Sequence, residues 1–192
     1  DNTAYWEKFL KRKIISTKIS FRPTFCVDSS KSILGNTAYL IDGGRFNKFL
    51  TIALNSSVAE YFFRSIFAEK QGGFYEVQPD GLGDFPVPAS GAETVLNSLD
   101  FSTAAPNPAL EQLLNGLIYE LYLPDDLHER GLHLFDAARK AGLERLSSLE
   151  GEKLAHAAAE FTSQHLAPGQ PLRVMLSDLQ TLDVVRIIEG KA

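Results

Sequence analysis

A change of character at Pro88 constrains the fold of this sequence more than any other feature. Before Pro88, short segments rich in β-branched and aromatic residues are separated by glycine, proline and serine turns, which is typical of strands mixed with helices. After Pro88, Leu and Ala dominate and prolines separate long stretches, which is typical of helices. We therefore predict a mixed α+β fold, with an α/β domain at 1–88 and a mainly helical region at 89–192. The 192 residues are enough for one large domain or two small ones.

The first part carries the pattern of strands. Lys13–Phe21 (KIISTKISF) alternates from Ile15 onward, so its side chains divide between two opposite faces. One face holds Ile15, Thr17, Ile19 and Phe21. The other is polar, and we expect it to be exposed to solvent: it holds Ser16, Lys18, Ser20 and Arg22. Further short strands are predicted at 24–27, 36–41 and 74–77.

Helical patterns follow the strands. Apolar residues recur at spacings of three and four from Phe46 to Leu54, and Ser57 with Glu60 has the spacing of a capping box. We expect a small twisted sheet backed by a helix pair at 46–69, with a loop at 78–84. In the second part, helices are predicted at 91–99, 108–122, 125–142, 150–165 and 175–188.

Charge is divided unevenly along the chain. Residues 1–88 hold eleven Lys and Arg against nine Asp and Glu, a net charge of +2, while residues 89–192 hold eight against fifteen, a net charge of −7. Only the first part has an electrostatic attraction for a polyanion. We expect the acidic second part to pack on the first part, on a further domain or on a partner subunit.

Cys26 is the single cysteine, which excludes an internal disulfide and favours a reducing, cytoplasmic setting. No apolar run reaches the roughly 18–20 residues of a membrane span. The chain begins at Asp1 without an initiator Met, so we expect it to be a fragment of a longer protein.

Four segments in order resemble a known family. They are the opening strand Lys13-Ile14-Ile15, the strand Asn36–Ile41 (NTAYLI), the helix end Phe49–Ser56 (FLTIALNS), and Gly72-Gly73-Phe74-Tyr75 followed by Phe85-Pro86-Val87-Pro88. This order resembles the TaqI-like C-terminal specificity domain of adenine-specific DNA methyltransferases and type IIG restriction–modification enzymes. A weaker similarity continues through Leu117–Tyr122, so the resemblance covers about 13–123.

The resemblance implies a module that recognises double-stranded DNA for a methyltransferase domain elsewhere in the same chain. It implies S-adenosylmethionine, and for a nuclease also Mg²⁺, as cofactors of the parent protein, with none in this segment. Basic side chains near the polar strand face can meet phosphates and base edges, with Arg gripping guanine bidentately and Lys acting as a point charge. We predict these DNA-contacting residues: Lys11, Arg12, Lys13, Lys18, Ser20, Arg22, Arg45, Lys48 and Tyr75. For the strand face the alternative is a solvated surface, and for Tyr75 it is a place in the core.

Catalytic motifs are not found in the sequence. A flipped adenine requires an Asn-Pro-Pro-Tyr-type motif, and only Asn107-Pro108 occurs, followed by Ala109. Nuclease-like fragments at Asp80 and at Glu189–Lys191 are isolated. We therefore expect no catalytic residues in this segment.

A metal site is also not expected from the sequence. His128 and His133 are five residues apart on one predicted helix, which is not the four-residue spacing of a helical zinc site. Cys26 is remote from both in the sequence.

Two other functions remain open at this point. The acidic helical half could be a protein–protein interaction module, with the first part as its scaffold. An enzyme with an unrecognised site is the second, and metal-dependent cleavage of DNA would reveal it.

Overall fold

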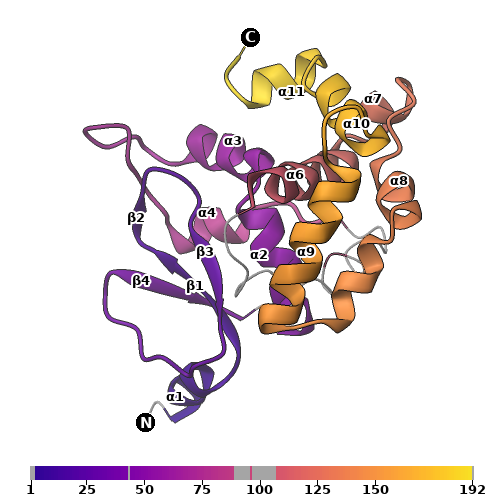
Figure 1. The fold of residues 1–192 in the computed structure, drawn as a ribbon. Coiled ribbons are helices and arrows are strands. Elements are labelled where there is room, and N and C mark those ends of the chain that lie inside the picture. The colour runs from indigo at the N-terminus through magenta and orange to yellow at the C-terminus, as the bar shows by residue number, and fades with distance from the viewer. Residues whose placement is uncertain (1–2, 43, 89–95, 97–106, 192) are drawn as a thin grey trace. The chain divides into compact units, whose positions relative to one another are not determined.

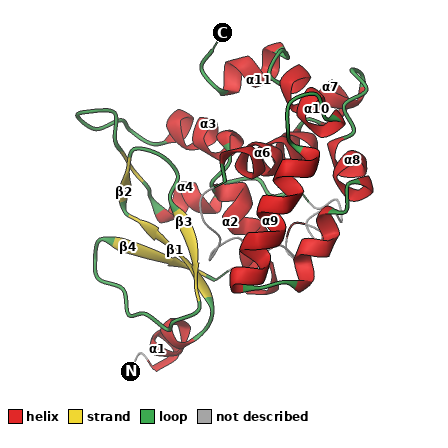
Figure 2. Ribbon diagram, in the orientation of Figure 1, coloured by secondary structure: helices red, strands yellow, loops and turns green. Residues whose placement is uncertain are grey.

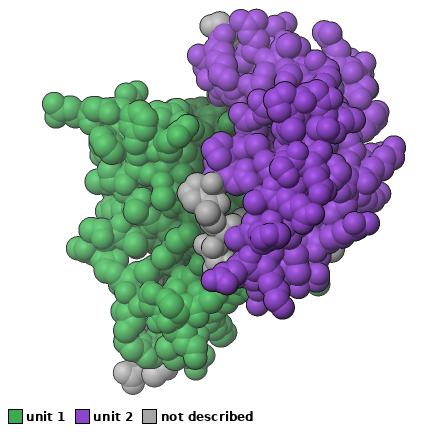
Figure 3. All heavy atoms as spheres, in the orientation of Figure 1, with its two compact units in different colours: residues 1–87 green, residues 88–192 purple. Residues whose placement is uncertain are grey.

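A computed structural model describes residues 3–42, 44–88, 96 and 107–191. The chain forms two compact units, residues 1–87 and residues 88–192, which Figure 3 shows in green and purple. Figure 2 shows that the strands belong to the first unit, and that the second unit is helical where it is described. This confirms the predicted mixed α+β class. In the described part of the chain, no helix is long and apolar enough to cross a membrane.

The first unit is built around two small antiparallel sheets (Figure 1). One has the order β3-β1-β4, formed by β1 (Lys13–Thr17), β3 (Phe25–Asp28) and β4 (Ala38–Ile41). The other pairs β2 (Ile19–Ser20) with β5 (Tyr75–Glu76). In the first sheet, Ile14 stands opposite Val27 on one side and Ile41 on the other. The single strand predicted at 13–21 is thus two strands that belong to different sheets.

Lys18 is the junction between these two sheets. Its backbone N–H donates to the carbonyl of Thr37, just before β4, at 2.8 Å. Its carbonyl accepts from the N–H of Val77, just after β5, at 2.9 Å. One residue therefore anchors both sheets through its backbone.

The described part of the first unit has four helices and one 3₁₀ turn besides its strands. They are α1 (Thr3–Leu10), the 3₁₀ turn η1 (Gly44–Phe46), α2 (Asn47–Leu54), α3 (Ser57–Ile66) and α4 (Pro79–Gly83). The α2 helix packs on β1 and β3, and Phe63 of α3 contacts Phe25 of β3 with ring centroids 6.0 Å apart. Phe63 also stacks on Phe67 at 5.5 Å, which extends an aromatic core behind the sheet. The helix pair predicted at 46–69 therefore backs the sheet.

Local details differ from the sequence predictions. The cap of α3 is Ser56, whose Oγ accepts from the N–H of Ala59 at 3.2 Å, one residue before the predicted Ser57. The side chain of Asn55, the residue before this cap, holds β3: it donates to the carbonyl of Phe25 at 2.7 Å and accepts from the N–H of Phe25 at 2.9 Å. The predicted loop at 78–84 contains the short helix α4, which Pro79 begins. The α1 helix was not predicted.

The second unit contains seven described helical segments. They are α6 (Pro108–Tyr122), α7 (Pro124–His128), α8 (Leu134–Lys140), the 3₁₀ helix η2 (Leu143–Ser148), α9 (Gly151–His165), α10 (Pro171–Leu179) and α11 (Asp183–Ile188). The α6 helix begins where predicted because Asn107 caps it, accepting from the N–H of Leu110 at 3.1 Å, and Pro108 occupies its first position. Gly116 of α6 allows close packing, since a Cβ there would lie 2.8 Å from Leu176 of α10.

Two predicted helices of this unit are each divided in two. The segment 125–142 is broken after α7, where Gly131 has φ of +72°. There the N–H of Gly131 donates to the carbonyl of His128, and the N–H of Leu132 donates to the carbonyl of Leu127, the bond pattern of a Schellman motif. The segment predicted at 175–188 consists of α10 and α11. The prediction at 91–99 lies outside the described residues, apart from Leu96.

Candidate DNA-contacting surface

The faces predicted for 13–21 are wrong at four positions. Ser16 and Ser20, from the predicted polar face, are buried at 4% and 8% exposure, while Ile19 and Phe21 are exposed at 57% and 51%. Ser16 lies on the same face as Ile14, which is fully buried. The serines are tolerated inside because they are small and hydrogen-bonded, Ser16 to the carbonyl of Thr17 and Ser20 to the carbonyl of Arg22.

Lys13, which was predicted as a DNA contact, is buried at 1% exposure. Its ammonium donates to the carbonyl of Phe9 at 2.9 Å and forms an ion pair with the carboxylate of Asp28. Burial alone would raise the pKa of Asp28, but hydrogen bonds from Lys13, Ser30 and Ser32 lower it well below its usual range. This pair ties the end of α1 to the end of β3.

Tyr75 and Ser20, which were also predicted as DNA contacts, are buried as well. The ring of Tyr75 is 1% exposed and stacks on Phe67 with centroids 6.1 Å apart. Among the described residues, the Tyr75 hydroxyl has no hydrogen-bond partner. Burial raises the pKa of Tyr75 to about 12, with a further upward contribution from Glu60. Tyr75 is a core residue, which was the alternative considered for it.

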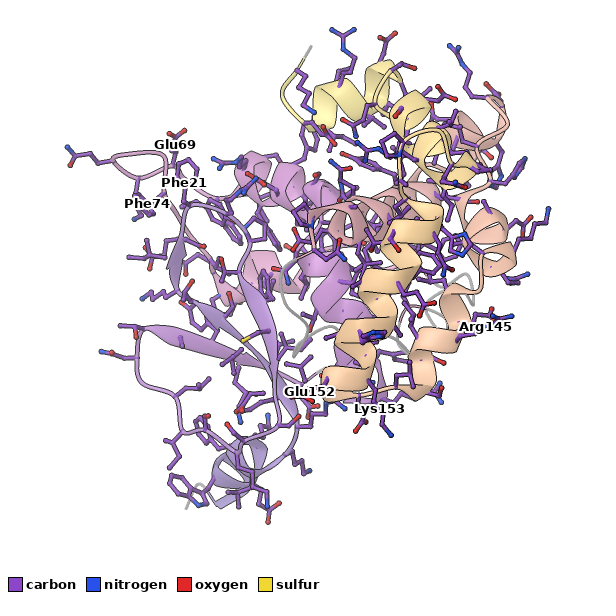
Figure 4. All side chains as sticks on the ribbon, viewed as in Figure 1. Phe21, Glu69, Phe74, Arg145, Glu152 and Lys153 are labelled. Carbon is purple, nitrogen blue, oxygen red and sulfur yellow. The ribbon has the colours of Figure 1, made fainter. Side chains whose placement is uncertain are left out.

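The surface at the second sheet combines two exposed aromatic rings with four cations, and we call it the β2–β5 tip. It comprises Phe21, Phe74, Lys18, Arg64 and Lys70, together with Arg22, which follows Phe21 in the sequence. Figure 4 shows Phe21 and Phe74 beside each other, with Glu69 close by. The two rings meet edge to face with centroids 5.8 Å apart, and both are more than two-fifths exposed. Arg64 lies over Phe21 at 5.5 Å and donates to the Phe21 carbonyl at 2.7 Å.

Most of the cations at the tip are paired. Lys18 and Lys70 each lie 3.1 Å from a carboxylate oxygen of Glu76, and Arg64 lies 3.0 Å from Glu60. The hydrogen bond from Lys70, and then that from Lys18, lowers the pKa of Glu76; the hydrogen bond to Glu76 in turn raises the pKa of Lys18. Arg22 is exposed, and its guanidinium has no ion-pair partner among the described residues.

A second basic group lies near the start of β1, and we call it the α1–α2 group. It comprises Lys11, Arg12, Arg45 and Lys48, of which only Lys48 is partly covered. The side chain of Asn47 donates to the carbonyl of Arg12 at 3.3 Å and so holds these two segments together. Arg45 lies over the ring of Phe46 at 4.7 Å.

Arg12 and Lys18, one from each basic surface, lie on either side of β1 along the chain. The predicted contacts therefore divide into two separate groups.

Phe21, Phe74 and Arg64 were not among the predicted contacts. Phe21 was predicted on the apolar strand face, and Arg64 falls within the helix pair predicted at 46–69. The signal that could have identified them is the pair Gly72-Gly73, both with positive φ. A Cβ at Gly73 would lie 3.0 Å from the Phe21 ring, so this turn is shaped around that ring.

The residues matched in a family comparison coincide with the first unit. Residues 1–87 match the model of the TaqI-like C-terminal specificity domain, which is the family that the sequence resemblance indicated. Residues 1–87 are therefore similar to a DNA-specificity module of the kind that methyltransferases carry. Residues 88–192 lie outside this match. Searches of curated proteins and of solved structures gave no match.

Proposed function

We propose that this chain recognises a specific double-stranded DNA sequence and places a methyltransferase domain of a restriction–modification enzyme on its target. The observation that carries the proposal is the match of residues 1–87 to the specificity domain. The two exposed basic surfaces of this unit support it, because positioning a protein on DNA relies on cations that meet phosphates.

The β2–β5 tip is the better candidate for base recognition. Arg22 offers an exposed guanidinium that has no ion-pair partner among the described residues, and this group can bind guanine bidentately in the major groove. Phe21 and Phe74 add apolar surface next to it, which can contact a thymine methyl group. The α1–α2 group, with Lys11 and Arg12, fits the role of phosphate contacts that fix the register.

Selection from a randomised duplex library, followed by fluorescence anisotropy with the full chain, tests the proposal. We expect one preferred sequence and an affinity that falls steeply with salt. Arg22→Ala should cost about 1–3 kcal/mol and relax the preference at one position. Lys11→Ala should weaken binding to all sequences alike and reduce the salt slope by about one.

Lys140→Ala is the matched control, since Lys140 is an exposed cation of α8 in the second unit. It should leave DNA affinity unchanged. Lack of binding even at low salt, or equal effects of Arg22→Ala and Lys140→Ala, would contradict the proposal. Binding to a protein partner with little salt dependence would instead support the interaction-module alternative.

The parent enzyme would supply S-adenosylmethionine, and Mg²⁺ if it also cleaves DNA. Both belong to the proposed methyltransferase and nuclease parts. No step of recognition by the first unit requires either of them.

A further inference from the structure

The turn between α7 and α8 brings a carboxylate and two imidazoles together. Glu120 of α6, His128 at the end of α7 and His133 just before α8 each place one ligand atom within 4.8 Å of the others. Among the described residues, this is the one group of three metal-ligating side chains so arranged. It lies entirely within the second unit, outside the specificity domain.

Glu120 is held in a fixed position. Its side chain is 8% exposed, and Oε2 accepts from the backbone N–H of Phe135 at 2.7 Å. The other oxygen, Oε1, lies 2.9 Å from Nε2 of His128. A buried carboxylate costs free energy unless its lone pairs are used, so Oε1 needs a proton donor or a cation at this place.

The two histidines converge because the helix is interrupted. The Schellman motif at Gly131 reverses the chain between them, and their rings stack with centroids 4.5 Å apart. Both side chains are exposed, so they are accessible to solvent and can turn about their side-chain bonds.

We propose that Glu120, His128 and His133 bind one Zn²⁺-class divalent ion. One carboxylate oxygen and two imidazole nitrogens are a ligand set that zinc accepts, whereas Mg²⁺ and Ca²⁺ take oxygen ligands. Three protein ligands leave the fourth tetrahedral position to water. Zinc binds neutral imidazole, so the ring nitrogen of each histidine that meets the ion carries no proton and its other ring nitrogen does.

The geometry requires one adjustment. Zinc ligands at about 2.0–2.2 Å from the ion lie about 3.3–3.6 Å from each other. The ligand atoms of Glu120 and His128 are already near that separation. Rotation of the exposed His133 ring away from the His128 ring directs a nitrogen of His133 to the ion position between Glu120 and His128. The ion then joins the end of α6 to both sides of the α7–α8 turn.

Isothermal titration of Zn²⁺ into the untagged full chain tests the site, together with Co²⁺ absorbance in the visible range as a report on coordination. We expect one ion per chain, with His133→Ala weakening binding at least about tenfold. His133 is exposed, so this variant leaves the fold intact, and far-UV circular dichroism checks that it does. His128→Ala should have the same effect.

His156→Ala is the matched control because His156 is an exposed histidine of α9, outside the group. It should bind Zn²⁺ like the wild type, and saturating Zn²⁺ should raise the melting temperature of the wild type but not of His133→Ala. If no Zn²⁺ binds, the contact between Glu120 and His128 is a structural hydrogen bond only and the proposal fails. Binding that His133→Ala leaves unchanged overturns it equally, because the ion then lies elsewhere. Neither result bears on DNA recognition by the first unit.

Discussion

At the scale of single residues, Lys13 carries its charge into the interior of the first unit. The sequence indicates a basic strand end, and a lysine there is expected at the surface. Its partner Asp28 is fifteen residues away, at the far end of β3, so only the antiparallel register of β1 with β3 brings them together. Burial of Lys13 could not be predicted because the pairing of these strands was not known.

Breaking this pair should destabilise the first unit. Asp28→Asn leaves the buried Lys13 ammonium without a counter-charge, so the free energy of unfolding should fall by about 3–5 kcal/mol in urea titrations at pH 7. The double variant Lys13→Met with Asp28→Asn removes both charges and should recover most of that loss. If Asp28→Asn alone were as stable as the wild type, the ion pair between Lys13 and Asp28 would contribute nothing to stability.

The same pair predicts a pH dependence. Because the pKa of Asp28 is lowered in the folded state, its contribution to stability is present above its unfolded value of about 3.9 and is lost as the pH falls through the folded value. The difference in stability between the wild type and Asp28→Asn should therefore shrink steadily below about pH 4. Unfolding curves between pH 7 and pH 2.5 measure it, and a constant difference would contradict the prediction.

At Tyr75, in contrast, we predict a substitution that does not lower the stability of the first unit. Its buried hydroxyl makes no hydrogen bond with the described residues, so Tyr75→Phe should keep or raise stability by about 1 kcal/mol. Tyr75→Ala should lose about 3–5 kcal/mol because it leaves a cavity beside Phe67. Thermal unfolding measures both. DNA affinity that falls in Tyr75→Phe would restore this residue as a contact.

At the scale of elements, long capped helices were predictable and strand faces were not. The α6 helix follows from Asn107 and Pro108, which are local signals of a helix start. Alternation at 13–21 identifies two faces, but a period of two does not indicate which face is buried. The buried face was decided by α2, which packs on β1 and β3. The break at Gly131 was missed because a single glycine is tolerated inside a helical pattern.

The candidate site was predictable only in part. Lys11 and Arg22 are exposed, as predicted for contacts, while Lys13, Ser20 and Tyr75 are interior. The aromatic rings of the β2–β5 tip come from segments more than fifty residues apart, Phe21 and Phe74. Their contact depends on the pairing of β2 with β5, which local patterns do not specify.

We also predict that one substitution at the β2–β5 tip raises DNA affinity. Glu76→Gln removes the carboxylate that pairs with Lys18 and Lys70, so both ammonium groups become available to phosphates. DNA affinity at low salt should rise, and the salt slope should steepen by up to about two. Anisotropy titrations at several salt concentrations measure the slope.

Glu144→Gln is the control for this change. Glu144 is exposed and pairs with Arg139 of α8 at 3.4 Å, so the substitution alters net charge equally in the second unit. Equal effects of the two variants would show that total charge, and not the β2–β5 tip, governs DNA affinity.

At the scale of the whole molecule, the two units differ in charge, +2 before residue 89 and −7 after it. DNA should therefore protect the first unit alone. Hydrogen–deuterium exchange of the full chain with and without its selected duplex should slow in peptides covering 13–22 and 70–77. Peptides from α9 to α11 should exchange unchanged. Slowed exchange in those helices would place DNA on the second unit and contradict the division of roles.

The position of Lys18 between the two sheets limits how such a module can acquire a new target. Because its backbone is bonded to both sheets, an insertion or deletion beside it would shift β2 by one residue against β5. Side chains alternate with a period of two, so that shift would bring Ser20 to the surface and turn Phe21 inward. The two sheets therefore tolerate substitutions at exposed positions such as Arg22, which can change the preferred DNA sequence. Insertions and deletions are tolerated only outside the strands.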